Sequence, residues 1–167
     1  NTEQQIELAK RVEAAAMSTD ERVTNSEGGD FDSSSGRVVL GNSHGFLGEY
    51  QSSSFSMSVS PVATDPETGA MQRDSWYSVQ RKFAKLDSPE AVGLEAARRT
   101  VQKLGARKVA TQRLPVIFDS ETAGSLMGNL CSAVSGYSLY KGASFLAGQL
   151  GKPLAPEYVT VYDDGRV

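Results

Sequence analysis

Between residues 22 and 83 the sequence changes to a period of two, interrupted by glycine and asparagine breaks, and no other feature restricts the fold of this chain as strongly. The clearest case is residues 52–60, where Phe55, Met57 and Val59 alternate with serines, which predicts a strand with one apolar and one hydroxyl-bearing face. We interpret the hydroxyl face as solvated, and less readily as the polar wall of a substrate groove. Breaks typical of turns lie at residues 28–29, 34–36, 42–45 and 66–69, so the region is predicted to be an antiparallel β-meander.

Helical spacing is found on both sides of this region. Residues 1–20 carry apolar side chains at steps of three and four, which predicts a helix. Another helix is predicted from Pro89 to Gly105, because Ser88 and Pro89 are typical of a helix start and glycine of a helix end. Further elements are predicted as a strand at 108–118, a helix at 121–136, a shorter helix at 143–150 and a strand at 158–162.

These elements together indicate an α+β fold, in which an antiparallel β-meander packs against several helices. A chain of 167 residues is long enough to bury a sizeable core without disulfides and is typical of one domain. We therefore interpret residues 1–167 as a single domain, with a helix over 1–20, the meander over 22–83 and mixed helix and strand over 88–167.

Charge and cysteine content disfavour several classes of protein. The 17 basic and 20 acidic residues give a net charge of −3 without any long basic cluster, which disfavours direct nucleic-acid binding. No run approaches the roughly 18 apolar residues that span a membrane, and the first residues lack a secretion signal. A single cysteine permits no intrachain disulfide. We therefore predict a cytoplasmic protein with no membrane partner and no direct nucleic-acid partner.

Cys131 and His44 are the candidates for nucleophilic chemistry. Cys131 lies on the apolar side of a predicted helix, which favours a small core residue over a reactive thiol. His44 is the only histidine, and the sequence Asn-Ser-His-Gly around it predicts a hairpin tip, where an imidazole is seldom held rigidly enough for a catalytic triad. An independent Ser or Cys hydrolase that uses either residue is a lesser alternative.

The helix predicted over residues 121–136 follows a short apolar strand and begins after Asp119 and Ser120, which are typical N-cap residues. One of its faces is continuously apolar and is predicted to be buried in the core. That face consists of Ala123, Leu126, Met127, Leu130, Val134 and Tyr137. A second row contains only small residues, which lets another backbone approach closely. The packing surface expected there consists of Gly124, Gly128, Ser132 and Gly136 with nearby Tyr140, Lys141 and Phe145.

The sequence from residue 114 to residue 161 resembles the PmbA/TldD family of metallopeptidases and modulators of DNA gyrase, and specifically its PmbA (TldE) branch. Further matching segments are residues 25–29, 41–46, 73–77 and 97–100. The resemblance covers nearly the whole chain and implies the α+β fold of the family's central region. Because the chain starts with asparagine and lacks the family's flanking regions, we expect it to be the central part of a longer chain.

In the TldD branch, the corresponding helix carries a His-Glu-x-x-x-His motif. Its histidines bind zinc, its glutamate activates water, and a cysteine from a C-terminal domain completes the site. Laid on this helix, the motif places its histidines at Gly128 and Ala133 and its glutamate at Asn129. None of these three residues offers a zinc ligand or a general base. The resemblance therefore implies no catalytic residue, metal or cofactor in this chain, with zinc expected in a TldD-like partner.

The function expected from this resemblance is that of a non-catalytic PmbA/TldE-like subunit. It would belong to a cytoplasmic, heteromeric zinc metallopeptidase of the TldD/TldE type that degrades or processes peptides. The alternative is a stand-alone binding or assembly module with a regulatory role such as gyrase modulation. This alternative includes a homodimer. In either case the chain is a member of a metallopeptidase family that is not expected to be catalytic alone.

Overall fold

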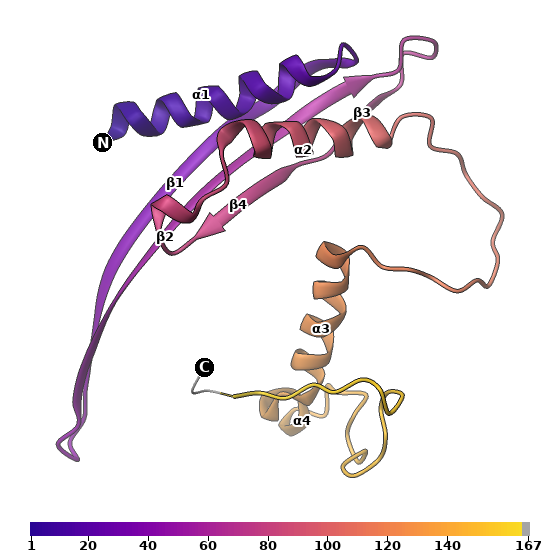
Figure 1. The fold of residues 1–167 in the computed structure, drawn as a ribbon. Helices are drawn as coiled ribbons and strands as arrows, with labels where there is room; N and C mark the ends of the chain where they lie inside the picture. The colour runs from indigo at the N-terminus through magenta and orange to yellow at the C-terminus, as the bar shows by residue number, and fades with distance from the viewer. Residues whose placement is uncertain (165–167) are drawn as a thin grey trace. The chain divides into compact units, whose positions relative to one another are not determined.

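The computed structural model describes residues 1–164, and their contacts gather into two compact units, Asn1–Val109 and Ala110–Val167 (Figure 1). We call these the N-terminal unit and the C-terminal unit. Residues 105–122 are all exposed, and regular secondary structure is absent from residues 106–119. A segment that buries nothing cannot join two cores into one, which is why the chain has two units where the sequence was interpreted as a single domain.

The N-terminal unit begins with α1, Thr2–Thr19, as predicted. The Asn1 side chain caps this helix by accepting hydrogen bonds from the backbone N–H groups of Glu3 and Gln4, at 2.8 and 3.3 Å. The inner face of α1 buries Val12 and Ala16 completely. The second helix of the unit, α2, spans Pro89–Gln102 and is capped by the Ser88 hydroxyl, which accepts from Ala91 N–H at 3.2 Å.

The predicted antiparallel meander is confirmed, with its turns at 42–45 and 66–69. The turns predicted at 28–29 and 34–36 are wrong, because both lie inside one continuous strand, where residues 26–29 form only an irregularity in the pairing and residues 34–36 pair regularly with residues 52–54. The meander consists of β1 (Val23–Gly41), β2 (Leu47–Thr64), β3 (Met71–Arg73) and β4 (Trp76–Gln80). β2 is the central strand, because β1 pairs along one of its edges while β3 and β4 pair in succession along the other. A short 3₁₀-helix, η1, spans Phe83–Lys85 between β4 and α2.

Both helices cover the same face of the sheet, and the core lies between them and β2. Met57 and Val59 are about 1 % exposed and pack against Val12 of α1 and Val92 of α2. Burial of each such side chain contributes about 1.5 to 3 kcal/mol. The opposite face carries the serines that alternate with these residues, which are partly exposed and are covered by neither helix. The two faces predicted from the sequence are therefore confirmed.

Glycine allows the closest approach between the two helices. A Cβ atom at Gly93 of α2 would lie 2.7 Å from the Ala15 Cβ, 2.7 Å from the Val12 carbonyl oxygen and 2.8 Å from the Ala16 nitrogen. Because two of these neighbours are backbone atoms, they cannot move aside without displacing α1. The glycine therefore sets the distance between α1 and α2.

The β1–β2 ribbon continues far beyond the two helices, as Figure 1 shows. Near the start of α1, the Ser33 hydroxyl of β1 accepts from the Gln5 amide nitrogen at 2.8 Å. Beyond it, residues 34–52 form a two-stranded hairpin that we call the arm. Its tip is a turn in which the Asn42 side chain accepts from the backbone N–H groups of His44 and Phe46.

In the C-terminal unit, α3 spans Ser120–Val134 as predicted, but the elements around it differ. α4 spans Gly136–Tyr140, in place of the helix predicted at 143–150, where the chain forms only turns. Gly142, Gly148 and Gly151 have φ between +64° and +78°, a conformation that ends helices. The strands predicted at 108–118 and 158–162 are wrong for the described residues, because an apolar run pairs only where a second strand lies beside it. No helix within residues 1–164 has the length and apolar character needed to cross a membrane.

Candidate active-site helix

α3 is positioned by its own cap. The Asp119 carboxylate accepts a hydrogen bond from Glu121 N–H at 3.0 Å, and the Asp119 carbonyl accepts one from Ala123 N–H at 2.8 Å. Acidic residues at this end also interact favourably with the helix dipole. The N-cap predicted from the sequence at Asp119 is therefore confirmed.

The apolar face of α3 is largely exposed, so its predicted burial is wrong for the described residues. Leu126 is 46 % exposed and Val134 is 52 % exposed. The physical reason is that few other elements of the C-terminal unit lie against α3, which contacts α4 and the turn that follows. The small-residue row is exposed as well, and a Cβ at Gly124, Gly128 or Gly136 would meet no atom within 4 Å.

The remaining residues of the predicted packing surface are also exposed. Tyr140 is 89 % exposed, and Phe145 lies in the turn after α4 with 77 % exposure. Lys141 places its ammonium group 4.5 Å from the centre of the Tyr137 ring, a cation–π contact within the unit. Ser132 is exposed too. Within the described residues nothing packs on this surface, so its role as an interface stays a prediction.

The three positions of the zinc motif differ in their surroundings. Gly128 is exposed and has open space around it, so a larger side chain would fit. Asn129 turns its amide nitrogen back onto the helix and donates to the Ser125 carbonyl at 2.9 Å. Ala133 is buried, and its carbonyl accepts a hydrogen bond of 2.6 Å from the hydroxyl of Ser144. The turn after α4 is thereby held against the position of the second histidine.

The donor set on α3 does not fit zinc. Glycine and alanine have no ligating atom, and the neutral amide of Asn129 has no basicity near neutral pH with which to activate water. Among residues 1–164, no three His, Cys, Asp or Glu side chains lie close enough together to share a metal ion. The helix therefore offers a scaffold of the right shape without the groups that zinc hydrolysis requires.

The two candidates for nucleophilic chemistry lie in different units. His44 is exposed in the arm's tip, which confirms the predicted hairpin turn. Cys131 is exposed on α3, so the prediction that it is a core residue is wrong for the described residues, for the same reason that the apolar face is uncovered. Neither unit brings a triad together around these residues, and an independent hydrolase has no assembled site in the described part of the chain.

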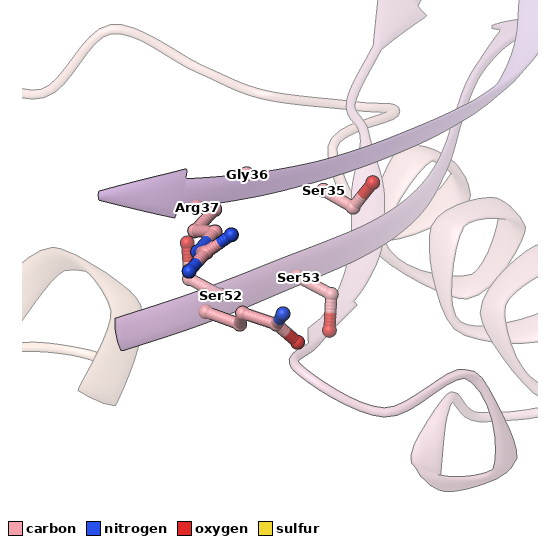
Figure 2. A pocket seen from close by; sticks show the side chains of 6 residues that line it. Ser35, Gly36, Arg37, Ser52 and Ser53 are labelled. Carbon is pink, nitrogen blue, oxygen red and sulfur yellow. The ribbon is translucent and has the colours of Figure 1, made fainter. Parts of the chain in front are cut away.

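The polar residues of the arm line an open depression of about 440 Å³. Figure 2 shows its lining on the two strands of the arm, where Ser35 of β1 pairs with Ser53 of β2 and Arg37 with Gln51. Arg37 is held by an ion pair with Glu49 on the neighbouring strand. The depression is shallow and contains no charge without a partner, so it has the character of a solvated surface.

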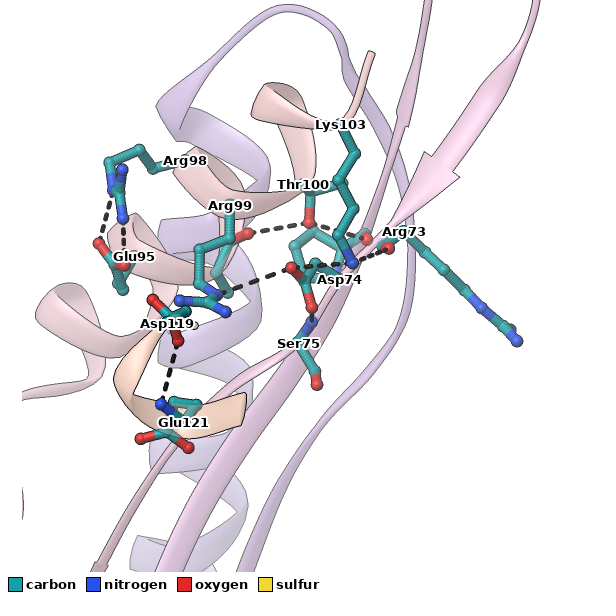
Figure 3. A network of polar contacts seen from close by, with 12 residues as sticks. Arg73, Asp74, Ser75, Glu95, Arg98, Arg99, Thr100, Lys103, Asp119 and Glu121 are labelled. Atoms are coloured by element: carbon teal, nitrogen blue, oxygen red, sulfur yellow. Dashed lines mark hydrogen bonds and ion pairs between the residues drawn. The ribbon is translucent and has the colours of Figure 1, made fainter. Parts of the chain in front are cut away.

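A cluster of charges at the start of β4 was missed by the sequence interpretation, which used residues 73–77 only for the family resemblance. Figure 3 shows Arg99 of α2 and Lys103, the residue after that helix, directed at Asp74, with nitrogen-to-Oδ2 distances of 3.6 and 3.0 Å. Burial raises the pKa of Asp74, but hydrogen bonds from Lys103 and from Ser75 N–H and the nearby cations lower it by more, so its pKa lies below the usual value of an aspartate. The Arg99 guanidinium also lies 4.8 Å from the Trp76 ring centre. This cluster joins α2 to the sheet and is structural.

Two family models match this chain. The PmbA/TldA metallopeptidase central domain matches residues 1–104, and the C-terminal domain of the same family matches residues 111–167. The break between the matches coincides with the exposed segment that separates the N-terminal unit from the C-terminal unit.

Curated relatives agree with these matches. Metalloprotease PmbA of Escherichia coli O157:H7 is 45 % identical over 156 residues, which make up 93 % of this chain and 34 % of that protein. The metalloprotease PmbA homologue of Haemophilus influenzae is 40 % identical over 155 residues, again 93 % of this chain and 34 % of the relative. The chain thus spans about a third of the length of these relatives.

Solved structures share the fold. A proposed modulator of DNA gyrase from Bacteroides thetaiotaomicron superimposes with a TM-score of 0.80 at 28 % identity, over 90 % of this chain and 34 % of that one. A protein of the same description from Thermotoga maritima gives a TM-score of 0.81 at 23 % identity with the same coverage, which shows likeness of fold alone. From its family matches, its relatives and its fold, the chain belongs to the PmbA/TldD metallopeptidase family.

Proposed function

We propose that this chain is part of a non-catalytic, PmbA/TldE-like subunit of a heteromeric zinc metallopeptidase. A TldD-like partner would hold the zinc and cleave peptides, and the assembly would act in the cytoplasm. The observation that carries this proposal is the donor set on α3, where Gly128, Asn129 and Ala133 occupy the positions of the zinc motif. Family membership supports the peptidase context, and the missing donors support the non-catalytic role.

Two features of α3 support a subunit that keeps this helix but lacks the catalytic residues of the zinc motif. The helix is regular and capped at Asp119, so the scaffold that would present a motif is intact. At the second histidine position, the buried Ala133 is in contact with the Ser144 turn, which occupies the space beside it. A subunit that keeps this helix can contribute walls and contacts to a closed peptidase chamber without holding a metal.

The proposal is tested by peptide cleavage with purified full-length proteins. The subunit alone, its TldD-like partner alone and the mixture are assayed on unfolded peptides, before and after treatment with a chelator and after addition of zinc. We expect cleavage that depends on the TldD-like protein, is lost with chelator and returns with zinc. Chelator-sensitive cleavage by the subunit alone would overturn the proposal.

A matched pair of variants sharpens this assay. Asn129→Ala in the subunit removes the only polar side chain at the three motif positions, and should leave cleavage by the mixture unchanged. Alteration of the glutamate in the partner's motif should abolish it, because that residue would activate the water. A large loss of activity with Asn129→Ala would instead assign this helix a direct part in catalysis.

A second candidate function is a homodimeric assembly module with a regulatory role such as gyrase modulation. The observation that favours it is the arm, which exposes large apolar side chains without a partner in the described residues. The description of the Bacteroides thetaiotaomicron protein as a proposed modulator of DNA gyrase agrees with this candidate. Native mass measurement separates the two, since a homodimer that ignores the TldD-like protein favours regulation and a mixed complex favours the peptidase.

A further inference from the structure

The stretch of chain that follows α2 is open to solvent along its whole length. It has neither helix nor strand from residue 106 to residue 119, as Figure 1 shows, and each of these residues is exposed. Residues 106–118 make no backbone hydrogen bond to any other residue within 1–164. Both the side chains and the backbone groups of this stretch are therefore available to a ligand.

The same part of the sequence is strongly basic. Residues 96–118 contain six lysine or arginine residues and no aspartate or glutamate, although the whole chain has a net charge of −3. Three of these cations form ion pairs with carboxylates of the N-terminal unit. They are Arg98, Arg99 and Lys103. The excess positive charge is thus concentrated on the remaining three.

Those remaining cations are Arg107, Lys108 and Arg113. All three are exposed, and none makes an ion pair or a hydrogen bond within residues 1–164. The nearest acidic residues along the chain are engaged elsewhere, since Glu95 pairs with Arg98 and Asp119 caps α3. Fully extended, the chain from Arg107 to Arg113 spans about 20 Å, the length of a short extended peptide.

We propose that residues 106–113, which we call the basic segment, bind acidic peptides. Guanidinium groups pair with carboxylates through two parallel hydrogen bonds, and two of the three cations are arginines. The free carbonyl groups of the segment can accept from peptide N–H groups, whereas a phosphate backbone has no such donors. Val109, which is 79 % exposed, adds an apolar contact that a peptide side chain can cover.

The number of cations also favours a peptide over a nucleic acid. Proteins that bind DNA tightly neutralise about 6 to 10 phosphates, and the basic segment offers three unpaired cations. The choice of a peptide rests on the proposed function, in which the assembly processes peptides. The basic segment would then recruit acidic peptides as the substrate class.

The test measures peptide binding to the full-length subunit by fluorescence anisotropy, without the TldD-like partner. The labelled peptides differ only in carrying Glu, Gln or Lys at the same positions. We expect the Glu peptide to bind most tightly and its affinity to fall as salt is added. Combined Arg107→Gln, Lys108→Gln and Arg113→Gln should raise the Kd of the Glu peptide about tenfold, because three exposed ion pairs are lost. Binding of the Gln peptide and the unfolding temperature should not change.

A matched control removes the same charge elsewhere. Combined Lys10→Gln, Lys82→Gln and Lys85→Gln alters three exposed lysines of the N-terminal unit and should change the Kd less than about twofold. Equal weakening by the two triple variants would assign binding to net charge and overturn the inference. A single-stranded DNA oligonucleotide that binds the basic segment more tightly than the Glu peptide would also overturn it.

Cleavage by the mixture with the TldD-like protein separates this inference from the proposed function. The Arg107, Lys108 and Arg113 triple variant should raise KM for the Glu peptide about tenfold and leave kcat unchanged, because the lost contacts act on binding. If the mixture cleaves no peptide but the Glu peptide still binds through the basic segment, only the proposed function fails. If the mixture cleaves but the triple variant alters neither Kd nor KM, only this inference fails.

Discussion

At the scale of single residues, the most constrained side chains of the N-terminal unit are the charged ones at the start of β4. Asp74 is 18 % exposed and accepts from Lys103 and from Ser75 N–H, while Arg99 lies beside it and over Trp76. Sequence patterns do not predict this cluster, because its members are distant along the chain and meet only after α2 has packed on the sheet. The tip of the arm differs, since a turn depends on neighbouring residues, and the hairpin tip at 42–45 was predicted from them.

Replacement of Asp74 by asparagine should destabilise the protein in a pH-dependent manner. The folded pKa of Asp74 lies below that of an aspartate in the unfolded chain, so its ion pairs stabilise the fold above the unfolded pKa, and the contribution is lost as the pH falls through the lowered folded pKa. We expect Asp74→Asn to lower the free energy of unfolding by about 1 to 2 kcal/mol at pH 7. The difference from wild type should shrink as the pH falls through the lowered pKa of Asp74. Urea unfolding at several pH values measures this, with the exposed Glu67→Gln as control.

At the scale of elements, the sequence predicted the helices and strands that depend on local residue patterns. It failed for those features that depend on a neighbouring strand or helix. α1, α2 and α3 have clear periodicity and caps, residues 52–60 of β2 have a clear alternation, and all four elements form. The apolar runs at 108–118 and 158–162 have strand composition but no neighbouring strand in the described residues. The apolar face of α3 was predicted to be buried in the core and is exposed. Periodicity identifies the apolar face of a helix, but it does not show whether another element packs against that face.

The contact between α1 and α2 gives a test at this scale. Gly93→Ala should destabilise the N-terminal unit by about 1 to 3 kcal/mol, because the added methyl group overlaps backbone atoms of α1 and this outweighs the gain in helix propensity. Gly36→Ala is the matched control, since a Cβ there meets nothing within 4 Å. Thermal unfolding of the full-length protein compares the two. A Gly93→Ala variant as stable as Gly36→Ala would show that the helices are further apart than described.

At the scale of the whole molecule, residues 1–104 match the central domain of the PmbA/TldD family and residues 111–167 match its C-terminal domain. The family could be predicted from the sequence because its segments are distributed along nearly the whole chain. The lack of zinc ligands at positions 128, 129 and 133 could also be read directly from the sequence, because it depends only on the residue types at these positions. The division into two units could not, because it depends on which residues bury one another.

The central claim is that α3 cannot hold a catalytic zinc ion, and the zinc content of the purified full-length subunit tests it most directly. Native mass spectrometry after equilibration with zinc, before and after separation from the TldD-like protein, measures the metal bound to each subunit. We predict that the subunit retains no zinc and that the TldD-like protein retains one ion per chain. One zinc ion retained by the subunit and lost on Asn129→Ala would contradict the account.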